Sequence, residues 1–373
     1  MQIVVNTRLL LPNKLDGIGW FTFQTLKRIT VQHPNVHFVF LFDRNYNEDF
    51  IFSDNITPIV VGPEARHPFL YYLWFHRSVK QILNRMKPDL FLSTDGFLSL
   101  GATCKQLPVI HDINFFHNPK DLKPLTSKYY NYFFPKYAHA ATRIATVSEY
   151  SKRDIAKEYH IDGSKIDVVY NGINDGFKPL TDNEKKVTKE KFSQGKHYFL
   201  FVGSQSPRKN LNRLIAAFDI FKQRTQSDFK LVLVGAVYSS EGDVKKAIDK
   251  SVYKTDILIV GRQPQEELEN IMASAFALTF VPYFEGFGIP LIEAMQCQTP
   301  IICSNTTSIP EIAGDAGLLV NPFEVNDIAN AMIELFKNEN TRLQLIQNGI
   351  QRKENFSWDK SANLLWDSIN KCL

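Results

Sequence analysis

The feature that most constrains the fold of this chain is a series of short apolar runs, separated by helical patterns, that occurs twice. The first series begins with residues 2–6 (QIVVN) and 37–42 (HFVFLF), and the second begins with 198–203 (YFLFVG). Short, continuously apolar runs that alternate with helices are typical of the buried strands of a parallel sheet. The sequence therefore predicts an α/β fold with two Rossmann-like parallel-sheet domains and a cleft between them. The predicted strands are 2–6, 37–42, 57–61, 89–92, 108–111 and 142–147, followed by 198–203, 230–235, 257–261, 277–281, 300–303 and 317–320.

A polar segment between the two series predicts the domain boundary. Residues 176–196 are rich in Lys, Asp, Asn and Thr and poor in apolar side chains, which is typical of an interdomain linker. A length of 373 residues also suits two domains better than one. We place the boundary near residue 180, so that residues 1–180 form the N-terminal domain and residues 181–355 form the C-terminal domain.

The last segment, 356–373, predicts a packed terminal helix. Ser357 is a good N-cap residue, and the apolar side chains that follow it recur at helical spacing. A stripe of this kind is normally buried against a neighbouring element, so we expect the helix to pack back across the domains. The stripe consists of Ala362, Leu365, Trp366 and Ile369.

Composition excludes several classes of protein. The 43 basic and 39 acidic residues give a formal net charge of +4, which is too small and too dispersed to indicate a nucleic-acid-binding protein. The four cysteines show no C-x-x-C pairing, so we expect neither a disulfide framework nor a zinc site. The chain begins without a recognisable signal peptide, and no apolar stretch approaches the length that spans a bilayer. We therefore expect a cytoplasmic protein. The cysteines are Cys104, Cys297, Cys303 and Cys372.

The most informative stretch for function is VPYFEGFGIPLIEAMQCQTPI, which places Glu285 in a glycine-rich turn and Glu293 in the helix expected after it. Gly286 and Gly288 let the backbone approach a ligand closely, and Pro290 suits a first helical turn. Free backbone N–H groups at such a helix start form an anion site, so the turn can hold a sugar phosphate. Alone, either glutamate would be interpreted as an exposed surface acid. The glycines and the position after a predicted strand favour a binding site.

A second candidate is the Arg208-Lys209 pair, which follows the predicted strand 198–203 and precedes a helix opened by Asn210. Two cations beside a helix N-terminus can neutralise the charge of a bound phosphate group. The alternative is a solvated basic loop, and it is the strand, loop and helix context together with a family motif at 203–211 that favours phosphate binding. We expect Lys209 to be an exposed loop cation whose loss leaves folding nearly unaffected. The buried face of the helix is predicted to be Leu211, Leu214, Ile215 and Phe218.

The first domain offers weaker signals. Gly17 and Gly19 follow the first strand and precede the amphipathic run WFTFQTLKRI, but a lone Gly-x-Gly is weak evidence and is also explained by a tight turn. His111 and Asp112 lie at the end of an apolar run, at the sheet edge where ligands bind in open parallel sheets. A lone histidine is more often structural, whereas a His-Asp pair at a strand end favours a site.

These motifs resemble the retaining GT-B glycosyltransferases of family 4. The signature of that family is an E-x7-E segment, here Glu285 to Glu293 within EGFGIPLIEAM. The likeness covers almost the whole chain, and five motifs occur in the family's order, which makes the likeness specific. The other four motifs are 16–20 (DGIGW), 111–119 (HDINFFHNP), 146–151 (TVSEYS) and 203–211 (GSQSPRKNL).

The resemblance implies a GT-B fold that closes on a nucleotide diphosphate sugar, with the acceptor on the side of the first domain and the donor on the side of the second. It implies that Glu285 binds the transferred sugar, that Glu293 binds the ribose, and that His111 lies near the reacting carbon. It also implies that Gly17 and Gly19 contact the diphosphate or the acceptor. The expected catalytic residues are Glu285, His111, Arg208 and Lys209, and the expected donor-binding residues are Gly17, Gly19, Asp112, Gly286, Phe287, Gly288, Ile289 and Glu293.

One position departs from the family pattern. The family usually has small residues and a glycine just before the Thr-Pro, where this chain has Gln296, Cys297 and Gln298. If that glycine provides a positive-φ helix end, Gln298 must accept the strain or change the turn.

The chain contains no Asp-x-Asp, the metal-diphosphate motif of the other major glycosyltransferase fold. We therefore expect protein groups to neutralise the diphosphate, with no metal and no cofactor besides the nucleotide sugar as co-substrate. Retention of the anomeric configuration requires one of two mechanisms. One is double displacement through a carboxylate, and the other is front-face attack, in which the leaving phosphate accepts the acceptor's proton. No nucleophilic carboxylate is identified, so we favour front-face attack.

The segment 66–85 (RHPFLYYLWFHRSVKQILNR) interleaves aromatic and cationic residues. It could lie on a membrane, at the inner face, or receive a lipid-linked acceptor, but a core-facing aromatic helix is the simpler interpretation.

The expected function is transfer of a mannose- or glucose-type hexose to a glycan or lipid-linked acceptor, as in polysaccharide biosynthesis. The sequence does not distinguish among UDP, GDP and ADP sugars as the donor. The alternatives are a nucleotide-sugar epimerase of the same architecture and a non-catalytic nucleotide-sugar-binding subunit.

Overall fold

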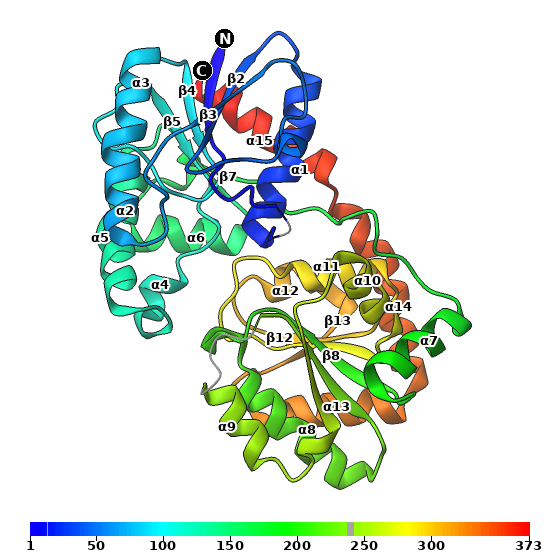
Figure 1. Ribbon diagram of the computed structural model, residues 1–373. Coiled ribbons are helices and arrows are strands. Elements are labelled where there is room, and N and C mark those ends of the chain that lie inside the picture. Colours follow the sequence, from blue (N-terminus) through cyan, green and yellow to red (C-terminus); the bar gives the residue numbers. More distant parts are fainter. Residues whose placement is uncertain (13, 237–241) are drawn as a thin grey trace. The chain divides into compact units, whose positions relative to one another are not determined.

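The computed structural model describes residues 1–12, 14–236 and 242–373. It contains two compact units, each built on a parallel sheet with covering helices (Figure 1). The first unit comprises Met1–Gly172 and Ser357–Leu373, and the second comprises Ile173–Phe356. The predicted α/β class with two Rossmann-like sheets is confirmed.

The sheet of the first unit has five strands in the order β3-β2-β1-β4-β5, and all neighbours are parallel. Two further strands, β6 and β7, form a separate parallel pair, and Val109 bridges to Ala145 of β6. The strands are β1 (Gln2–Asn6), β2 (His37–Phe42), β3 (Ile56–Val60), β4 (Leu90–Ser93), β5 (Lys105–Pro108), β6 (Ile144–Thr146) and β7 (Ile166–Val168).

Strand β5 lies earlier in the chain than predicted, since it ends at Pro108, where the predicted strand 108–111 begins. The cause is Gln106, which is buried even though it is polar. Its side-chain amide donates to the Ser99 carbonyl and accepts from the Ser99 N–H, both at 3.1 Å. Because these bonds satisfy the amide in the interior, a segment that looks like a loop in the sequence forms a buried strand.

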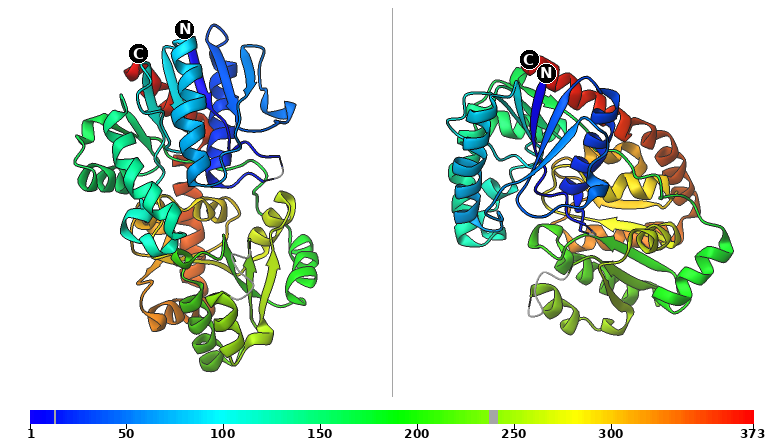
Figure 2. Two further views of the ribbon diagram at one scale, coloured as in Figure 1. Left: turned by 60° about the vertical axis from the view of Figure 1, so that its left-hand side comes forward. Right: turned by 45° about the horizontal axis from the view of Figure 1, so that its top comes forward.

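Helices α1 and α15 cover one face of this sheet, and α2, α3 and α5 cover the other (Figures 1 and 2). The terminal helix packs on α1, where Arg28 pairs with Asp359 and His33 stacks on Trp366 at 3.6 Å. Ser357 caps it, as predicted. The helices are α1 (Gly17–Gln32), α2 (Pro68–Leu73), α3 (Lys80–Met86), α4 (Asn114–His117), α5 (Pro124–Ala140), α6 (Glu149–Glu158) and α15 (Trp358–Cys372), with a π-helical turn at Trp74–Val79.

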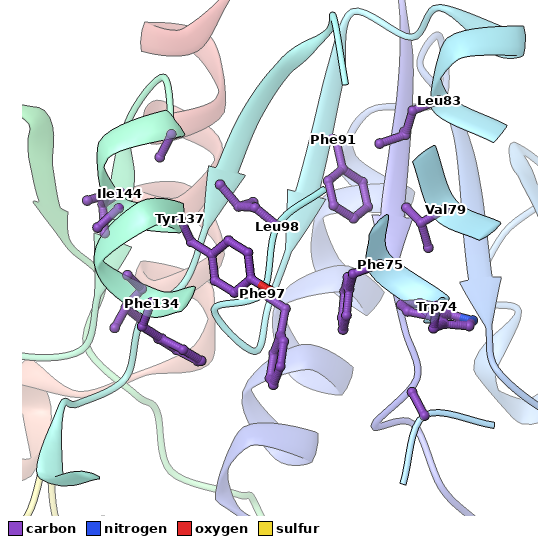
Figure 3. Packing of buried hydrophobic residues seen from close by; sticks show 14 of the residues in the cluster. Trp74, Phe75, Val79, Leu83, Phe91, Phe97, Leu98, Phe134, Tyr137 and Ile144 are labelled. Carbon is purple, nitrogen blue, oxygen red and sulfur yellow. The ribbon is translucent and has the colours of Figure 1, made fainter. Parts of the chain in front are cut away.

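The aromatic segment 66–85 contributes to the core on its inner side. Trp74 and Phe75 are fully buried, and Phe75 stacks on Phe97 with ring centroids 4.8 Å apart. Figure 3 shows these rings packed with Phe134 of α5 beneath the sheet. The core-facing interpretation of the segment is therefore confirmed for these side chains.

The sheet of the second unit has six parallel strands in the order β10-β9-β8-β11-β12-β13. Its strands are β8 (Tyr198–Val202), β9 (Lys230–Val234), β10 (Ile257–Gly261), β11 (Ala277–Phe280), β12 (Ile301–Ser304) and β13 (Gly317–Val320). Its helices are α7 (Asp182–Ser193), α8 (Leu211–Thr225), α9 (Asp243–Lys250), α10 (Gln265–Ser274), α11 (Ile289–Gln296), α12 (Ile309–Ala313), α13 (Val325–Lys337) and α14 (Glu339–Arg352).

The predicted linker 176–196 is wrong as a description of local structure, because most of it forms helix α7. Thr181 and Glu184 form a complete capping box, in which each side chain meets the backbone N–H of the other residue. α7 packs against α10 within the second unit. The buried residues of α7 are Thr188 and Ser193, which are both polar, so the composition of the segment hid the helix.

None of the helices in the described part of the chain combines the length and the apolar character needed to cross a bilayer.

Candidate active site

The centre of the candidate site is an ion-pair cluster in the second unit. Arg208 and Lys209 lie in a single 3-10 turn after β8, and Glu285 follows β11, the neighbouring strand. Adjacent parallel strands bring these loops together at the carboxyl edge of the sheet. Arg208 Nη1 lies 2.5 Å and Lys209 Nζ lies 2.6 Å from the same oxygen, Oε2 of Glu285. Two cations and one carboxylate give the cluster a net charge of +1.

The cluster is largely buried, and this corrects the expectation for Lys209. Only 9% of the Lys209 side chain and 14% of the Glu285 side chain are exposed, and the ammonium lies 4.7 Å from the ring centroid of Phe280. Lys209 is therefore not an exposed loop cation. Burial acts to raise the pKa of Glu285, but attraction to Arg208 and Lys209 outweighs burial and lowers it. Glu285 is thus a carboxylate at neutral pH.

Backbone and side-chain hydrogen bonds fix the position of Glu285. Its N–H donates to Thr307 Oγ1 at 3.2 Å, and its carbonyl accepts from Ser308 Oγ at 2.8 Å. The loops are also joined directly, because the Tyr283 N–H donates to the Arg208 carbonyl at 3.0 Å. Within the residues that the structure describes, Glu285 Oε1 accepts no hydrogen bond, so this oxygen can still accept one from a ligand hydroxyl.

Asn210 ends the cationic turn and fixes the start of α8. Its backbone is left-handed, with φ of 63°, a conformation that asparagine tolerates better than most residues. Its side-chain Nδ2 donates to the carbonyls of Val281 and Pro322 at 3.0 and 2.6 Å. The phosphate-loop candidate is thereby tied to the loops after β11 and β13. The predicted buried face of α8 (Leu211, Leu214, Ile215 and Phe218) is confirmed.

The predicted donor-binding stretch Gly286–Ile289 follows Glu285 directly and opens α11. Gly288 has φ of 99°, and a Cβ there would lie 2.9 Å from Cδ1 of Ile309, so only glycine fits without strain. No side chain caps the N-terminus of α11, and Pro290 lies in its first turn. Phe287 is buried against Phe356. Pro290 has no N–H, and the Leu291 N–H donates to the Gly288 carbonyl at 3.0 Å, so the helix start contributes the positive end of its dipole beside the cluster.

Glu293 lies one to two turns into α11 and is buried, with 8% exposed, so its interpretation as a surface helix residue is wrong. Burial raises the pKa of Glu293 to about 8, with a smaller contribution from repulsion by Glu269. No hydrogen bond or ion pair to its carboxyl occurs within residues 1–12, 14–236 and 242–373. Such a carboxyl is protonated at neutral pH until a ligand supplies hydrogen-bond donors. Sequence reasoning missed Glu269, because nothing in the motif points to it.

The end of α11 resolves the departure from the family pattern. Gln298 adopts φ of 58°, and its N–H donates to the Met295 carbonyl at 3.1 Å. Gln298 therefore adopts the left-handed backbone that a glycine would adopt more easily. Of the two predicted outcomes, accepted strain or a changed turn, the structure shows accepted strain.

His111 lies after β5 in the first unit. Its Nε2 is 2.9 Å from the Thr94 carbonyl oxygen, and because a carbonyl only accepts, Nε2 carries the proton of this bond. Burial lowers the pKa of His111, so the ring is neutral and Nδ1 is an acceptor. The neighbouring Asp112 accepts from the Asn114 N–H at 3.0 Å, which fixes the turn after the strand.

Gly17 and Gly19 lie in the first turn of α1. Asp16 caps this helix, and its Oδ1 accepts from the Gly19 N–H at 2.9 Å. A Cβ on Gly19 would lie 3.2 Å from the Leu9 carbonyl oxygen. These contacts give Gly19 a structural role in the turn, and its N–H is already bonded within the protein.

A cavity of about 390 Å³ is lined by part of the loop before α8 and by the first turns of α8 and α9. Asn212, Asp243 and Tyr283 contribute to its lining, whereas Glu285 and Glu293 do not. We place the candidate active site at the ion-pair cluster because charge, burial and an uncapped helix start converge there.

No group of three or more His, Cys, Asp or Glu side chains that could hold a metal ion occurs among the described residues.

Known structures share this architecture. Anabaena Alr3699/HepE, solved in complex with UDP and glucose, is similar with a TM-score of 0.77 at 14% identity, covering 99% of each chain. WaaG, a glycosyltransferase involved in lipopolysaccharide biosynthesis, has a TM-score of 0.75 at 16% identity, covering 97% of this chain and 98% of WaaG. The fold is therefore that of the GT-B glycosyltransferases.

Sequence comparisons identify the family. The model for Glycosyl transferases group 1 matches residues 182–352, and the model for Glycosyltransferase Family 4 matches residues 16–177. The uncharacterized glycosyltransferase MJ1178 of Methanocaldococcus jannaschii is 30% identical over 299 residues, 78% of this chain and 77% of that protein. O-antigen chain mannosyltransferase B of Escherichia coli is 26% identical over 362 residues, 92% of this chain and 93% of that protein. The chain belongs to glycosyltransferase family 4.

Proposed function

We propose that this glycosyltransferase is a retaining hexosyltransferase that moves a mannose- or glucose-type sugar from a nucleotide diphosphate sugar to a glycan or lipid-linked acceptor. The observation that carries the proposal is the buried cluster of Arg208, Lys209 and Glu285 beside the uncapped start of α11. It supplies cations for a diphosphate and a carboxylate for sugar hydroxyls in one place.

The names of the relatives favour mannose. The Escherichia coli relative is named an O-antigen chain mannosyltransferase, and so is RfbU of Salmonella typhimurium, which is 29% identical over 282 residues. A lipid-linked acceptor would place the reaction in the cytoplasm at the inner face of the membrane.

The donor site follows from the charges. A nucleotide diphosphate gains one negative charge when its bond to the sugar breaks, and a cluster of net charge +1 beside a helix start stabilises the products more than the donor. In this proposal Arg208, Lys209 and the positive end of the α11 dipole neutralise the leaving group without a metal. Glu293 binds the ribose hydroxyls.

The transfer step is front-face attack. The acceptor oxygen forms a bond to the anomeric carbon on the face from which the phosphate oxygen departs, and the acceptor's proton passes to that phosphate oxygen. No side chain is needed as a general base. Glu285 Oε1 and His111 Nδ1, both acceptors, orient hydroxyls of the transferred sugar and so position the anomeric carbon.

The test begins with a thermal-shift panel of UDP, GDP and ADP sugars, which identifies the donor. Donor hydrolysis is then followed by NMR without acceptor, and the first anomer released is identified. We expect release of the sugar with the anomeric configuration of the donor. Release of the opposite anomer would exclude retention, and conversion of the donor into an epimer would identify an epimerase.

A further inference from the structure

The cavity of about 390 Å³ in the second unit differs in chemistry from the ion-pair cluster. It lies at the first turns of α8 and α9, two helices that pack side by side (Figure 1). Its volume falls within the range of small-molecule sites, about 300–1,000 Å³. Arg208, Lys209 and Glu285 do not line it, so the proposed transfer of a sugar leaves this cavity unused.

Charge separates the two sides of the loop before α8. On one side, Arg208 and Lys209 pair with Glu285. On the other side, among the described residues that line the cavity, the charged ones are Arg213 and Asp243, one of each sign. The described lining therefore has no net charge, and a neutral ligand suits it better than a phosphate does.

Two residues with side-chain amides line the cavity. Gln205 is half-buried and Asn212 is exposed, and neither side chain makes a hydrogen bond to another residue within 1–12, 14–236 and 242–373. A side-chain amide donates through its nitrogen and accepts through its oxygen. These two amides can therefore bind groups that both donate and accept, such as the hydroxyls of a sugar.

Contacts among neighbouring residues hold the walls of the cavity in place. Arg213 Nη1 donates to Asn210 Oδ1 at 2.9 Å, and the guanidinium carbon of Arg213 lies 5.4 Å from the ring centroid of Phe323. Phe323 stacks on Tyr283, with ring centroids 6.2 Å apart and ring planes 23° apart. Tyr283 lines the cavity, so its ring is in place before a ligand binds, which lowers the entropic cost of binding.

We propose that this cavity binds a short neutral oligosaccharide, with Gln205 and Asn212 bonded to its hydroxyls and one sugar ring packed on Tyr283. A sugar ring has an apolar face of C–H groups, which the partly negative face of an aromatic ring attracts. The choice of a glycan rests on the proposed function, in which the acceptor is a glycan. Because the Tyr283 N–H donates to the Arg208 carbonyl at 3.0 Å, the cavity adjoins the cationic loop, and the bound oligosaccharide is part of the acceptor chain.

The test is saturation-transfer NMR of the full chain with two probes, a trisaccharide of α-linked mannose and a trisaccharide of α-linked glucose. We expect at least one of them to bind in the absence of donor and nucleotide. Asn212→Ala should weaken that binding about two- to tenfold, because it removes one neutral hydrogen bond. Asn212→Trp should weaken it about tenfold or more, because the larger side chain clashes with a ligand in the cavity.

The matched control is Gln223→Trp, which also replaces an exposed amide of α8. Gln223 lies about three turns after Asn212, so it shares a face of the helix with Asn212 but is remote from the cavity. The control should bind the probe as the wild type does, and melting curves should show that every variant is folded.

Three results would overturn the proposal. They are that neither trisaccharide binds, that both Asn212 variants bind the probe like the control, and that UDP or GDP displaces the probe, since the cavity would then belong to the nucleotide site. Donor hydrolysis is measured on the same samples. If the wild type binds the probe but hydrolyses no donor, the proposed function is contradicted and the oligosaccharide site is supported.

Discussion

Replacement of Lys209 by methionine tests the role of the cationic cluster most directly. Methionine keeps an apolar stem over Phe280, where the lysine ammonium lies 4.7 Å from the ring centroid, and removes only the charge. In the free protein this charge is paired with Glu285 at 2.6 Å, so it adds little to the affinity for the intact donor. Its interaction grows as the leaving diphosphate gains negative charge.

The expected loss is large in turnover and small in donor affinity. Removal of a preorganised electrostatic donor typically costs about 3–4 kcal/mol, or two to three decades in kcat. Because Lys209 is buried, the variant also leaves Glu285 with Arg208 as its single cationic partner, and we expect about 1–3 kcal/mol of lost stability. This replaces the sequence-based expectation that folding would be nearly unaffected.

The assay compares initial rates over a donor titration with nucleotide binding by calorimetry and with melting curves. Arg208→Ala should behave like Lys209→Met, and the double variant should lose less than the sum if both cations serve one phosphate. Lys209→Arg is the control that keeps the charge. A folded Lys209→Met variant with wild-type kcat would refute the proposed stabilisation of the leaving group.

Four further outcomes follow from the site. Glu293→Ala should weaken nucleotide binding by about 1.5–3 kcal/mol while kcat at saturating donor changes less, and unchanged affinity in calorimetry would remove Glu293 from the site. The pKa of Glu293 is raised from 4.5 to about 8 in the folded chain, so the folded state holds this proton longer than the unfolded state, and stability should fall as pH rises from about 4.5 to 8. Glu293→Gln should flatten that decline in denaturant titrations, and an unchanged slope would contradict the buried neutral carboxyl. EDTA should leave turnover intact, whereas loss restored by magnesium or manganese would contradict neutralisation by protein groups. Glu285→Gln, which raises the charge of the cluster from +1 to +2, should bind the nucleoside diphosphate product more tightly and turn over more slowly, and weaker product binding would argue against phosphate contact with Arg208 and Lys209.

The sequence was sufficient for the elements whose signals are local. Most of the buried strands, such as β2 and β8, are continuous apolar runs, whereas β5 contains the buried Gln106 and lies earlier than predicted. Pro290 and Gly288 mark the start of α11, and Ser357 marks the start of the terminal helix. The local sequence also identified Gln298 as a residue with strained, left-handed backbone. These features depend on residues a few positions apart, so a single sequence contains the information.

The ion-pair cluster could not be predicted, because it depends on strand order. β8 and β11 are neighbours only because the chain continues outward through β9 and β10 and then returns to the other side of β8. That order brings Arg208 and Lys209 to Glu285, about 77 positions further along the chain. The burial of Lys209 has the same origin, since the ring of Phe280 that covers it belongs to β11. Helix α7 is different, because its capping box was present in the sequence and composition was given too much weight.

The geometry of the cluster explains how a phosphate site can be stable when it is empty and effective when it is occupied. Two largely buried cations without a counter-charge would be costly, and Glu285 supplies that charge through a single oxygen, at 2.5 and 2.6 Å. In the proposed complex the phosphate becomes a second partner for the same cations, while Oε1 of Glu285 accepts from a sugar hydroxyl. The carboxylate then links the two parts of the donor that separate in the reaction, since it orients the sugar and holds the cations that receive the leaving group. Because these charges are in place before the donor arrives, little reorganisation is required as the bond breaks, which is the condition under which electrostatic stabilisation of a transition state is largest.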